Sequence, residues 1–138
     1  MSTRIGARGE YLVCAAILGL SEPWKVIHAP QDSIDVVAFL DSWFLRVSVK
    51  SSNLKVEDDR PTVGYKFAND HGGKRLPPNP KDIDIVAQCF IDVGRVAFFS
   101  ASSLQQKTYR RTCDFAQTPN LEQITWDKAV QDVQEQMK

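Results

Sequence analysis

The clearest pattern in the chain is an alternation of apolar and polar positions between residues 33 and 52. Successive side chains of a β-strand point to opposite faces, so positions two apart share a face. Residues 43–52 alternate in this way. The preceding run, residues 34–40, is rich in apolar β-forming residues, with Asp41 and Ser42 as a tight turn between the runs. The pattern predicts a β-hairpin with an apolar face made by Leu45, Val47 and Val49 and a polar face made by Arg46, Ser48 and Lys50.

The rest of the chain shows both helical and strand patterns. Apolar residues at helical spacing predict a helix over about residues 6–20 and another over about residues 121–137. Residues 24–28 are typical of a strand, and residues 83–92 and 95–100 of a second hairpin. This order indicates an α/β (α+β) fold, with a central mixed β-sheet flanked by helices. The length of 138 residues indicates one domain over residues 1–138.

Two segments of the second half carry more specific expectations. Residues 69–80 contain two glycines and three prolines, which predicts a long surface loop without helix or strand. The first arm of the second hairpin alternates apolar residues with Asp82, Asp84 and Gln88, so one of its faces is expected to be polar. We interpret Asp82 and Asp84 as exposed strand acids, with a substitute metal ligand as the alternative.

Composition and charge narrow the class of protein. The apolar fraction of 43% is sufficient for a sizeable core. Lysine plus arginine and aspartate plus glutamate both number 17, so the chain lacks the strong positive charge of a non-specific nucleic-acid binder. The middle of the chain is locally basic, because residues 60–81 hold five basic residues and one acid, Asp70. No apolar run is long enough to span a bilayer, and three cysteines without metal-like spacing suggest free thiols, so we expect a soluble cytoplasmic protein.

The candidate chemistry lies at one end of the first hairpin. Asp35 stands at the head of its first strand and Lys50 near the end of its second, so the hairpin brings a carboxylate and an ammonium group together. A carboxylate can hold a hard divalent cation, and a lysine can place or activate a water molecule. Taken singly, Asp35 and Lys50 are ordinary strand-end residues, and Glu10 is an ordinary glutamate early in a helix. The hypothesis of a site depends on their joint arrangement.

The order of the short motifs resembles that of a known superfamily. Arg8-Gly9-Glu10 on the first helix is followed by Ile34-Asp35, by Val49-Lys50-Ser51, by Tyr65 and by the second hairpin. With these motifs, over roughly residues 6–100, the sequence resembles the PD-(D/E)xK nuclease superfamily, which has the restriction-endonuclease-like fold. The resemblance is greatest to the branch of intron-encoded homing endonucleases, with Holliday-junction resolvases as more distant relatives.

The resemblance implies roles for four residues. Asp35 would be the central metal ligand, bridging Mg²⁺ (or Mn²⁺) and the scissile phosphate, and Glu10 would help to hold the metal or its water. Lys50 would orient the attacking water and stabilise charge on the phosphate. The family has an acid, or Gln in the homing branch, two positions before this lysine, where the present chain has Ser48. A serine hydroxyl is neutral and shorter, and contacts a metal weakly or through water.

These implications lead to an expected function and an alternative. The leading hypothesis is a Mg²⁺-dependent DNA endonuclease that hydrolyses phosphodiester bonds and acts as a homodimer or higher homo-oligomer. The alternative is a weakened or inactive nuclease-fold domain that acts in nucleic-acid binding or assembly. His28 and His71 have no partner at ligand spacing, which argues against a zinc site. Contacts to the DNA backbone are expected from Lys55, Arg60, Lys66, Lys74, Arg75 and Lys81.

Overall fold

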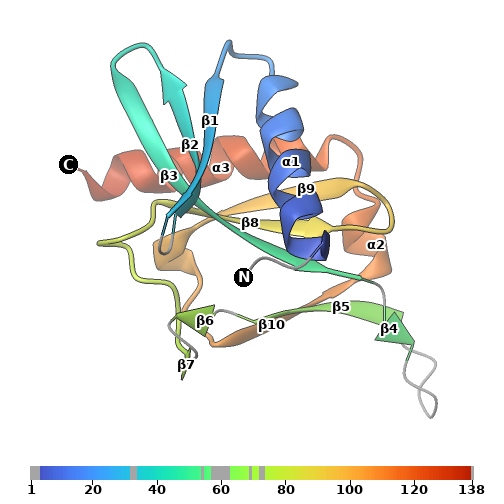
Figure 1. The fold of residues 1–138 in the computed structure, drawn as a ribbon. Helices are drawn as coiled ribbons and strands as arrows, with labels where there is room; N and C mark the ends of the chain where they lie inside the picture. The colour runs from blue at the N-terminus through green and yellow to red at the C-terminus, as the bar shows by residue number, and fades with distance from the viewer. Residues whose placement is uncertain are drawn as a thin grey trace.

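The elements follow one another in an order close to the expected one. The computed structural model describes residues 4–31, 34–53, 55–56, 63–68, 70–71 and 74–137 (Figure 1). In chain order the elements are α1 (Arg4–Leu18), β1 (Lys25–Gln31), β2 (Ile34–Leu40), β3 (Trp43–Ser52), β4 (Lys55–Val56), β5 (Val63–Ala68), β6 (Asp70–His71), β7 (Lys74–Arg75), β8 (Ile85–Phe90), β9 (Arg95–Ser100), the 3-10 helix η1 (Ala101–Ser103), β10 (Thr108–Thr112), α2 (Cys113–Ala116) and α3 (Leu121–Gln136).

A five-stranded mixed sheet forms the centre of the fold. Its strand order is β1-β2-β3-β8-β9, and β3 and β8 are parallel while the other neighbours are antiparallel. Both expected hairpins are present, as β2–β3 and β8–β9. A smaller sheet has the order β10-β5-β4. The predicted fold class, a central mixed sheet flanked by helices, is therefore confirmed.

The two faces of the central sheet are covered differently. Figure 1 shows α1 and α3 on one side of this sheet and the strands β4, β5 and β10 on the other. The helical side holds the larger core, which includes Val13, Ile17, Leu45, Val47, Ala87, Phe98 and Trp126. The small sheet and α2 enclose a second core, which includes Tyr65, Phe67, Phe90, Ala97 and Leu121.

This double covering corrects the expectation for the second hairpin. Every residue of β8 is buried, so the strand has no exposed polar face. The predicted alternation is wrong because the small sheet lies over the side that was expected to face water. Gln88 is fully buried there, and its Oε1 accepts a hydrogen bond of 2.9 Å from Arg111 Nε on β10. The strand β10 and the short helix α2, which build this layer, were not predicted.

The expectation of a loop without strands over residues 69–80 is also wrong. The two-residue strands β6 and β7 pair there in antiparallel fashion. A pairing of this length needs so little regular chain that neighbouring glycines and prolines do not prevent it.

The helix limits agree better with expectation, since α1 and the last helix α3 start and end within about two residues of the predicted bounds. No helix among the described residues has both the length and the apolar character needed to cross a membrane.

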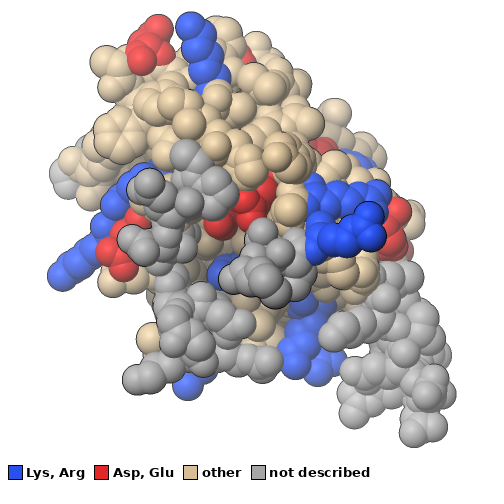
Figure 2. Space-filling view, in the orientation of Figure 1, with Lys and Arg blue, Asp and Glu red and all other residues tan. Residues whose placement is uncertain are grey.

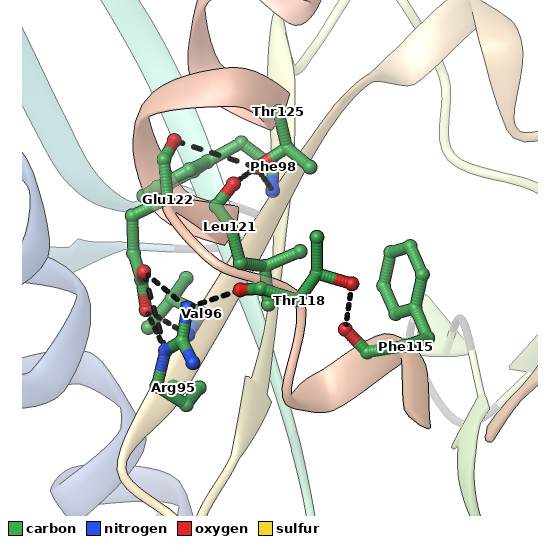
Figure 3. A network of polar contacts seen from close by, with 8 residues as sticks. All are labelled: Arg95, Val96, Phe98, Phe115, Thr118, Leu121, Glu122 and Thr125. Atoms are coloured by element: carbon green, nitrogen blue, oxygen red, sulfur yellow. Dashed lines mark hydrogen bonds and ion pairs between the residues drawn. The ribbon is translucent and has the colours of Figure 1, made fainter. Parts of the chain in front are cut away.

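The helix α3 lies along β9 and binds its outer edge. Glu122 accepts hydrogen bonds from Arg95 Nε at 3.0 Å and from the Val96 N–H at 3.0 Å. Thr125 Oγ1 accepts from the Phe98 N–H at 2.9 Å (Figure 3). Burial raises the pKa of Glu122, but the hydrogen bonds from Arg95 and Val96 outweigh this effect and hold the pKa below its usual value. The edge strand thus finds its hydrogen-bond partners in side chains of the helix.

The helix α1 approaches the sheet closely at Gly9. A Cβ atom on Gly9 would overlap Ser51 Oγ and would lie 3.1 Å from Ser51 Cβ. Next to this contact, the buried thiol of Cys89 donates to the Gly9 carbonyl oxygen at 3.4 Å, and burial raises the pKa of this thiol to about 12. Since Gly9 precedes Glu10, the close approach sets the height of Glu10 above the sheet.

We predict that Gly9→Ala destabilises the protein by about 2 kcal/mol, because an added methyl group in a filled contact forces α1 away from β3. The matched control is Gly19→Ala, where the nearest atoms to an added Cβ are the Ala15 and Ala16 carbonyl oxygens at 3.5 and 3.6 Å. Chemical denaturation of both variants measures the difference. Equal stabilities of the two variants would show that the contact between α1 and β3 is not tight.

Candidate active site

Asp35 lies where β2 separates from β3. The antiparallel ladder between these strands runs from the Leu40–Trp43 pair to the Val36–Val47 pair. Beyond this last pair, the Asp35 side chain takes the place of a backbone partner, and its Oδ2 accepts a hydrogen bond of 2.7 Å from the Val49 N–H. The carboxylate is therefore held against the β3 backbone by a bond to one of its two oxygens.

The register of the sheet relates Asp35 to Lys50 and Ser48. Val36 and Val47 face each other in the helical core, so the alternation of side chains puts Asp35, Ser48 and Lys50 on the opposite face. Ser48 is 2% exposed and is paired with Val86 of β8. Lys50 is half-buried and comes two residues later. A carboxylate and an ammonium group thus share the face that the hairpin pattern predicted.

Glu10 comes to this region from α1 and is paired with His28 of β1. Glu10 lies on the same stripe as the apolar residues Val13 and Ile17, so it points toward the sheet and is buried. Its Oε1 lies 2.6 Å from His28 Nε2, and the two side chains are 11% and 25% exposed. The His28 ring meets the Tyr11 ring edge-on, with 4.8 Å between centroids. A buried carboxylate needs such a partner, because an unpaired one loses its hydration without compensation.

The charges of these groups act on Asp35. Burial raises the pKa of Asp35, and the hydrogen bond from Val49 lowers it. The charge of Glu10 raises this pKa further, while the charges of Lys50 and His28 lower it, and the net effect is a raised value. The structure therefore brings Glu10, Asp35 and Lys50 into one electrostatic environment. In the view of Figure 2, acidic side chains lie near the middle of the molecule, between α1 and the hairpin strands, with lysine or arginine atoms on either side.

The residues that are present fit a hard cation with few protein ligands. Within the described ranges, no three His, Cys, Asp or Glu side chains gather closely enough to hold a metal ion. A cation here would have Asp35, assisted by Glu10, as its protein ligands, and water molecules for the remaining positions. Mg²⁺ is commonly bound in this way, through one or two carboxylates with several retained waters.

The contacts of Asp84 argue against the alternative that it is a substitute metal ligand. Its carboxylate accepts from the Arg46 backbone N–H at 2.8 Å and from Arg46 Nε and Nη2 at 3.1 Å each. Arg46 Nη1 also donates to the Lys81 carbonyl oxygen at 2.8 Å. The ion pair therefore fastens the segment before β8 to β3. Asp82 is exposed and Asp84 is half-buried, and both lie before the first residue of β8, so neither is the exposed strand acid that was expected.

The basic residues of the middle of the chain are described only in part. Lys66 is exposed on β5 and is paired with Arg110 of β10 on the outer face of the small sheet. Lys81 is exposed in the turn before β8. The backbones of Lys55 in β4 and of Lys74 and Arg75 in β7 are described without their side chains, and Arg60 lies outside the described residues.

Sequence reasoning missed His28 as a member of this region. Ligand spacing within the sequence shows no partner for it, because its partner Glu10 lies on another element, 18 residues away. The available signal was the strand alternation, which puts His28 on the side of β1 that α1 covers. A histidine at an expected core position indicates a buried polar partner.

The comparisons with known proteins concern the fold. No protein-family model matches the sequence, and no curated protein sequence is similar to it. Among solved structures, the chain is similar to the bacterial homing endonuclease I-Ssp6803I, with a TM-score of 0.66 and 18% sequence identity. The similarity covers 99% of this chain and 98% of that one. The chain therefore has the fold of this endonuclease over practically its whole length.

Proposed function

We propose that the protein is a metal-dependent DNA endonuclease that hydrolyses phosphodiester bonds. The observation that carries this proposal is the position of Asp35 and Lys50 on one face, where β2 leaves β3, with Glu10 acting on the same carboxylate. The full-length likeness to a homing endonuclease supports DNA as the substrate. The superfamily resemblance of the sequence supports the same chemistry, with Mg²⁺ or Mn²⁺ as the metal.

Each of the three residues has a role that follows from its surroundings. The Val49 N–H donates to Oδ2 of Asp35, so Oδ1 is the oxygen that would bind a cation. Lys50 carries a positive charge close to Asp35, where it would orient a water molecule and stabilise the charge that develops on the phosphate. Glu10 would hold the metal or its water from the helical side. The metal, when bound, supplies a Lewis acid at the phosphate and lowers the pKa of its bound water.

The buried serine two positions before Lys50 favours a second candidate function. Ser48 is neutral and almost inaccessible, so it adds no charge to a metal site. A chain with this replacement could be a weakened or inactive nuclease-fold domain that still binds nucleic acid. The two candidates differ in one measurable property, the presence of metal-dependent cleavage.

DNA would be held by the basic side chains of the small sheet and its surroundings. The small sheet packs on the face of the central sheet that carries Ser48 and Lys50. On its outer face, Lys66 and Arg110 are paired across β5 and β10. Two exposed basic side chains that lie side by side favour contact with the phosphate backbone of a nucleic acid. We extend the proposal to the other basic residues of the region: Lys55, Arg60, Lys74, Arg75 and Lys81.

We predict that Asp35→Asn and Lys50→Met each reduce metal-dependent cleavage by roughly 1,000-fold, since the first removes the charge that holds the cation and the second removes the cation that faces the phosphate. Asn keeps an oxygen acceptor for the Val49 N–H, so the fold is preserved. Asp127→Asn and Lys128→Met on α3 are matched controls with wild-type rates. The assay is cleavage of branched and linear DNA with Mg²⁺ or Mn²⁺.

In the same assay, Ser48→Asp should lower the metal concentration that is required for cleavage, because it adds a charged oxygen ligand.

Two outcomes of this assay would decide against the proposal. Cleavage that persists unchanged in Asp35→Asn and Lys50→Met would place the reaction elsewhere in the protein. A wild-type protein that binds DNA but cuts it with neither metal would favour the inactive nuclease-fold domain.

We predict that DNA binding weakens steeply with salt, and that Lys66→Gln reduces the slope of log K against log [salt] by about one. The control is Lys128→Gln, because Lys128 is exposed on α3, on the opposite side of the central sheet. Fluorescence anisotropy at several salt concentrations measures both slopes. Equal slopes for the two variants would remove Lys66 from the DNA-binding surface.

We propose further that the protein acts as a homodimer or higher homo-oligomer, because cutting both strands of a symmetric site requires two active sites. Light scattering at the concentration used for cleavage, with and without DNA, is expected to give at least twice the mass of one chain. A monomeric mass in both conditions would contradict this proposal.

A further inference from the structure

His28 faces α1 because of the strand to which it belongs. In β1 the exposed residues Lys25 and Ile27 alternate with Val26 and His28, which are half-buried. His28 is paired with Val36, a residue of the helical core, so its ring points toward the side of the sheet that α1 covers. An apolar residue at this position could be buried without removing a polar group from water. The chain instead has an imidazole there, directly against Glu10.

The pair is costly if it serves stability alone. Glu10 and His28 are both largely removed from water, and replacing a buried polar or charged pair by apolar residues is often neutral or stabilising. The distance of 2.6 Å between Nε2 and Oε1 shows that the two side chains are in direct hydrogen-bond contact. The edge-on contact with Tyr11 holds the ring in this orientation. The pair therefore fixes the direction of one carboxylate.

A role as a third metal ligand does not fit the geometry. Nε2 of His28 is already directed at Glu10 Oε1. Glu10, His28 and Asp35 are all described residues, and they do not gather closely enough to hold one ion between them. The imidazole is thus placed to act on the carboxylate of Glu10 and not on a cation.

We propose that His28 is the positioning residue of Glu10, and that it holds this carboxylate by one oxygen so that the other is presented toward Asp35. This inference rests on the proposed nuclease function and adds a residue to it. The charge of His28 lowers the pKa of Asp35, so the two side chains are close enough to interact, which agrees with this placement. Since Ser48 contributes no charge, the site depends on two carboxylates, and the orientation of each one matters more than in a site with three.

The test compares two substitutions of His28 that differ in one hydrogen bond. His28→Gln keeps an N–H donor near the place of Nε2, whereas His28→Phe keeps the ring and removes the donor. Ile27→Thr, on the exposed face of the same strand, is the matched control. Binding of Mn²⁺ by calorimetry and DNA cleavage at limiting Mg²⁺ are measured for each variant, together with thermal unfolding to establish that the variants are folded.

We expect His28→Phe to weaken Mn²⁺ binding and to slow cleavage by about 10- to 100-fold, the usual effect of losing a group that orients a metal ligand. His28→Gln should stay within about threefold of the wild type, and Ile27→Thr should match it. In the background of Glu10→Gln, His28→Phe should add no further loss, because the two side chains act as one unit.

Several results would overturn the inference. Wild-type Mn²⁺ binding and cleavage in a folded His28→Phe variant would show that Glu10 needs no orientation. So would equal losses in His28→Gln and His28→Phe, or a full additional loss in the Glu10→Gln background. These results leave the proposed function intact. A wild-type protein that neither binds Mn²⁺ nor cuts DNA overturns the proposed function, and this inference with it.

Discussion

The hydrogen bond between the Asp35 carboxylate and the Val49 N–H is the interaction on which the candidate site depends. It lies where the ladder between β2 and β3 has ended, so a side chain satisfies a backbone donor that would otherwise lose its partner. On its other side, β3 is held in parallel register by β8. The strand that carries Ser48 and Lys50 is thus fixed from both sides. The bond thus ties the Asp35 carboxylate to the β3 backbone directly next to Lys50.

The contact between Gly9 and Ser51 adds the second constraint. It brings α1 as close to β3 as two backbones with one small side chain allow, and the next residue of the helix is Glu10. The candidate site is therefore assembled from a strand junction and a helix contact, each made by backbone and small residues. This arrangement costs little side-chain entropy, and it places the two carboxylates by rigid elements.

The features of the fold that could be predicted from the sequence are those determined by residues close together along the chain. The hairpin of β2 and β3 follows from a period of two and a turn at Asp41, whose φ of 55° is tolerated by aspartate. The same period identifies the face that carries Asp35, Ser48 and Lys50. The role of each of these residues remains a prediction, because geometry alone does not establish catalysis.

The parts that were not predictable depend on contacts between distant segments. The complete burial of β8 results from the pairing of β5 with β10, about 40 residues apart, which no local pattern reveals. In the same way, His28 has Glu10 as its partner only because α1 packs against β1, and no local pattern predicts this contact. The buried Gln88 had one signal in the sequence, a polar residue in an apolar run, but its partner Arg111 lies on a strand that was not predicted.

The side chains that α3 provides to β9 also decide how copies of this chain can meet. An edge strand with free N–H groups is a template for adding a strand from another molecule. On β9, Glu122 and Thr125 already occupy two of these donors. At the other edge, the register of β1 shifts after His28, and the proline at position 30 has no N–H to offer. Both edges of the central sheet therefore offer a poor template for a strand from another copy of the chain.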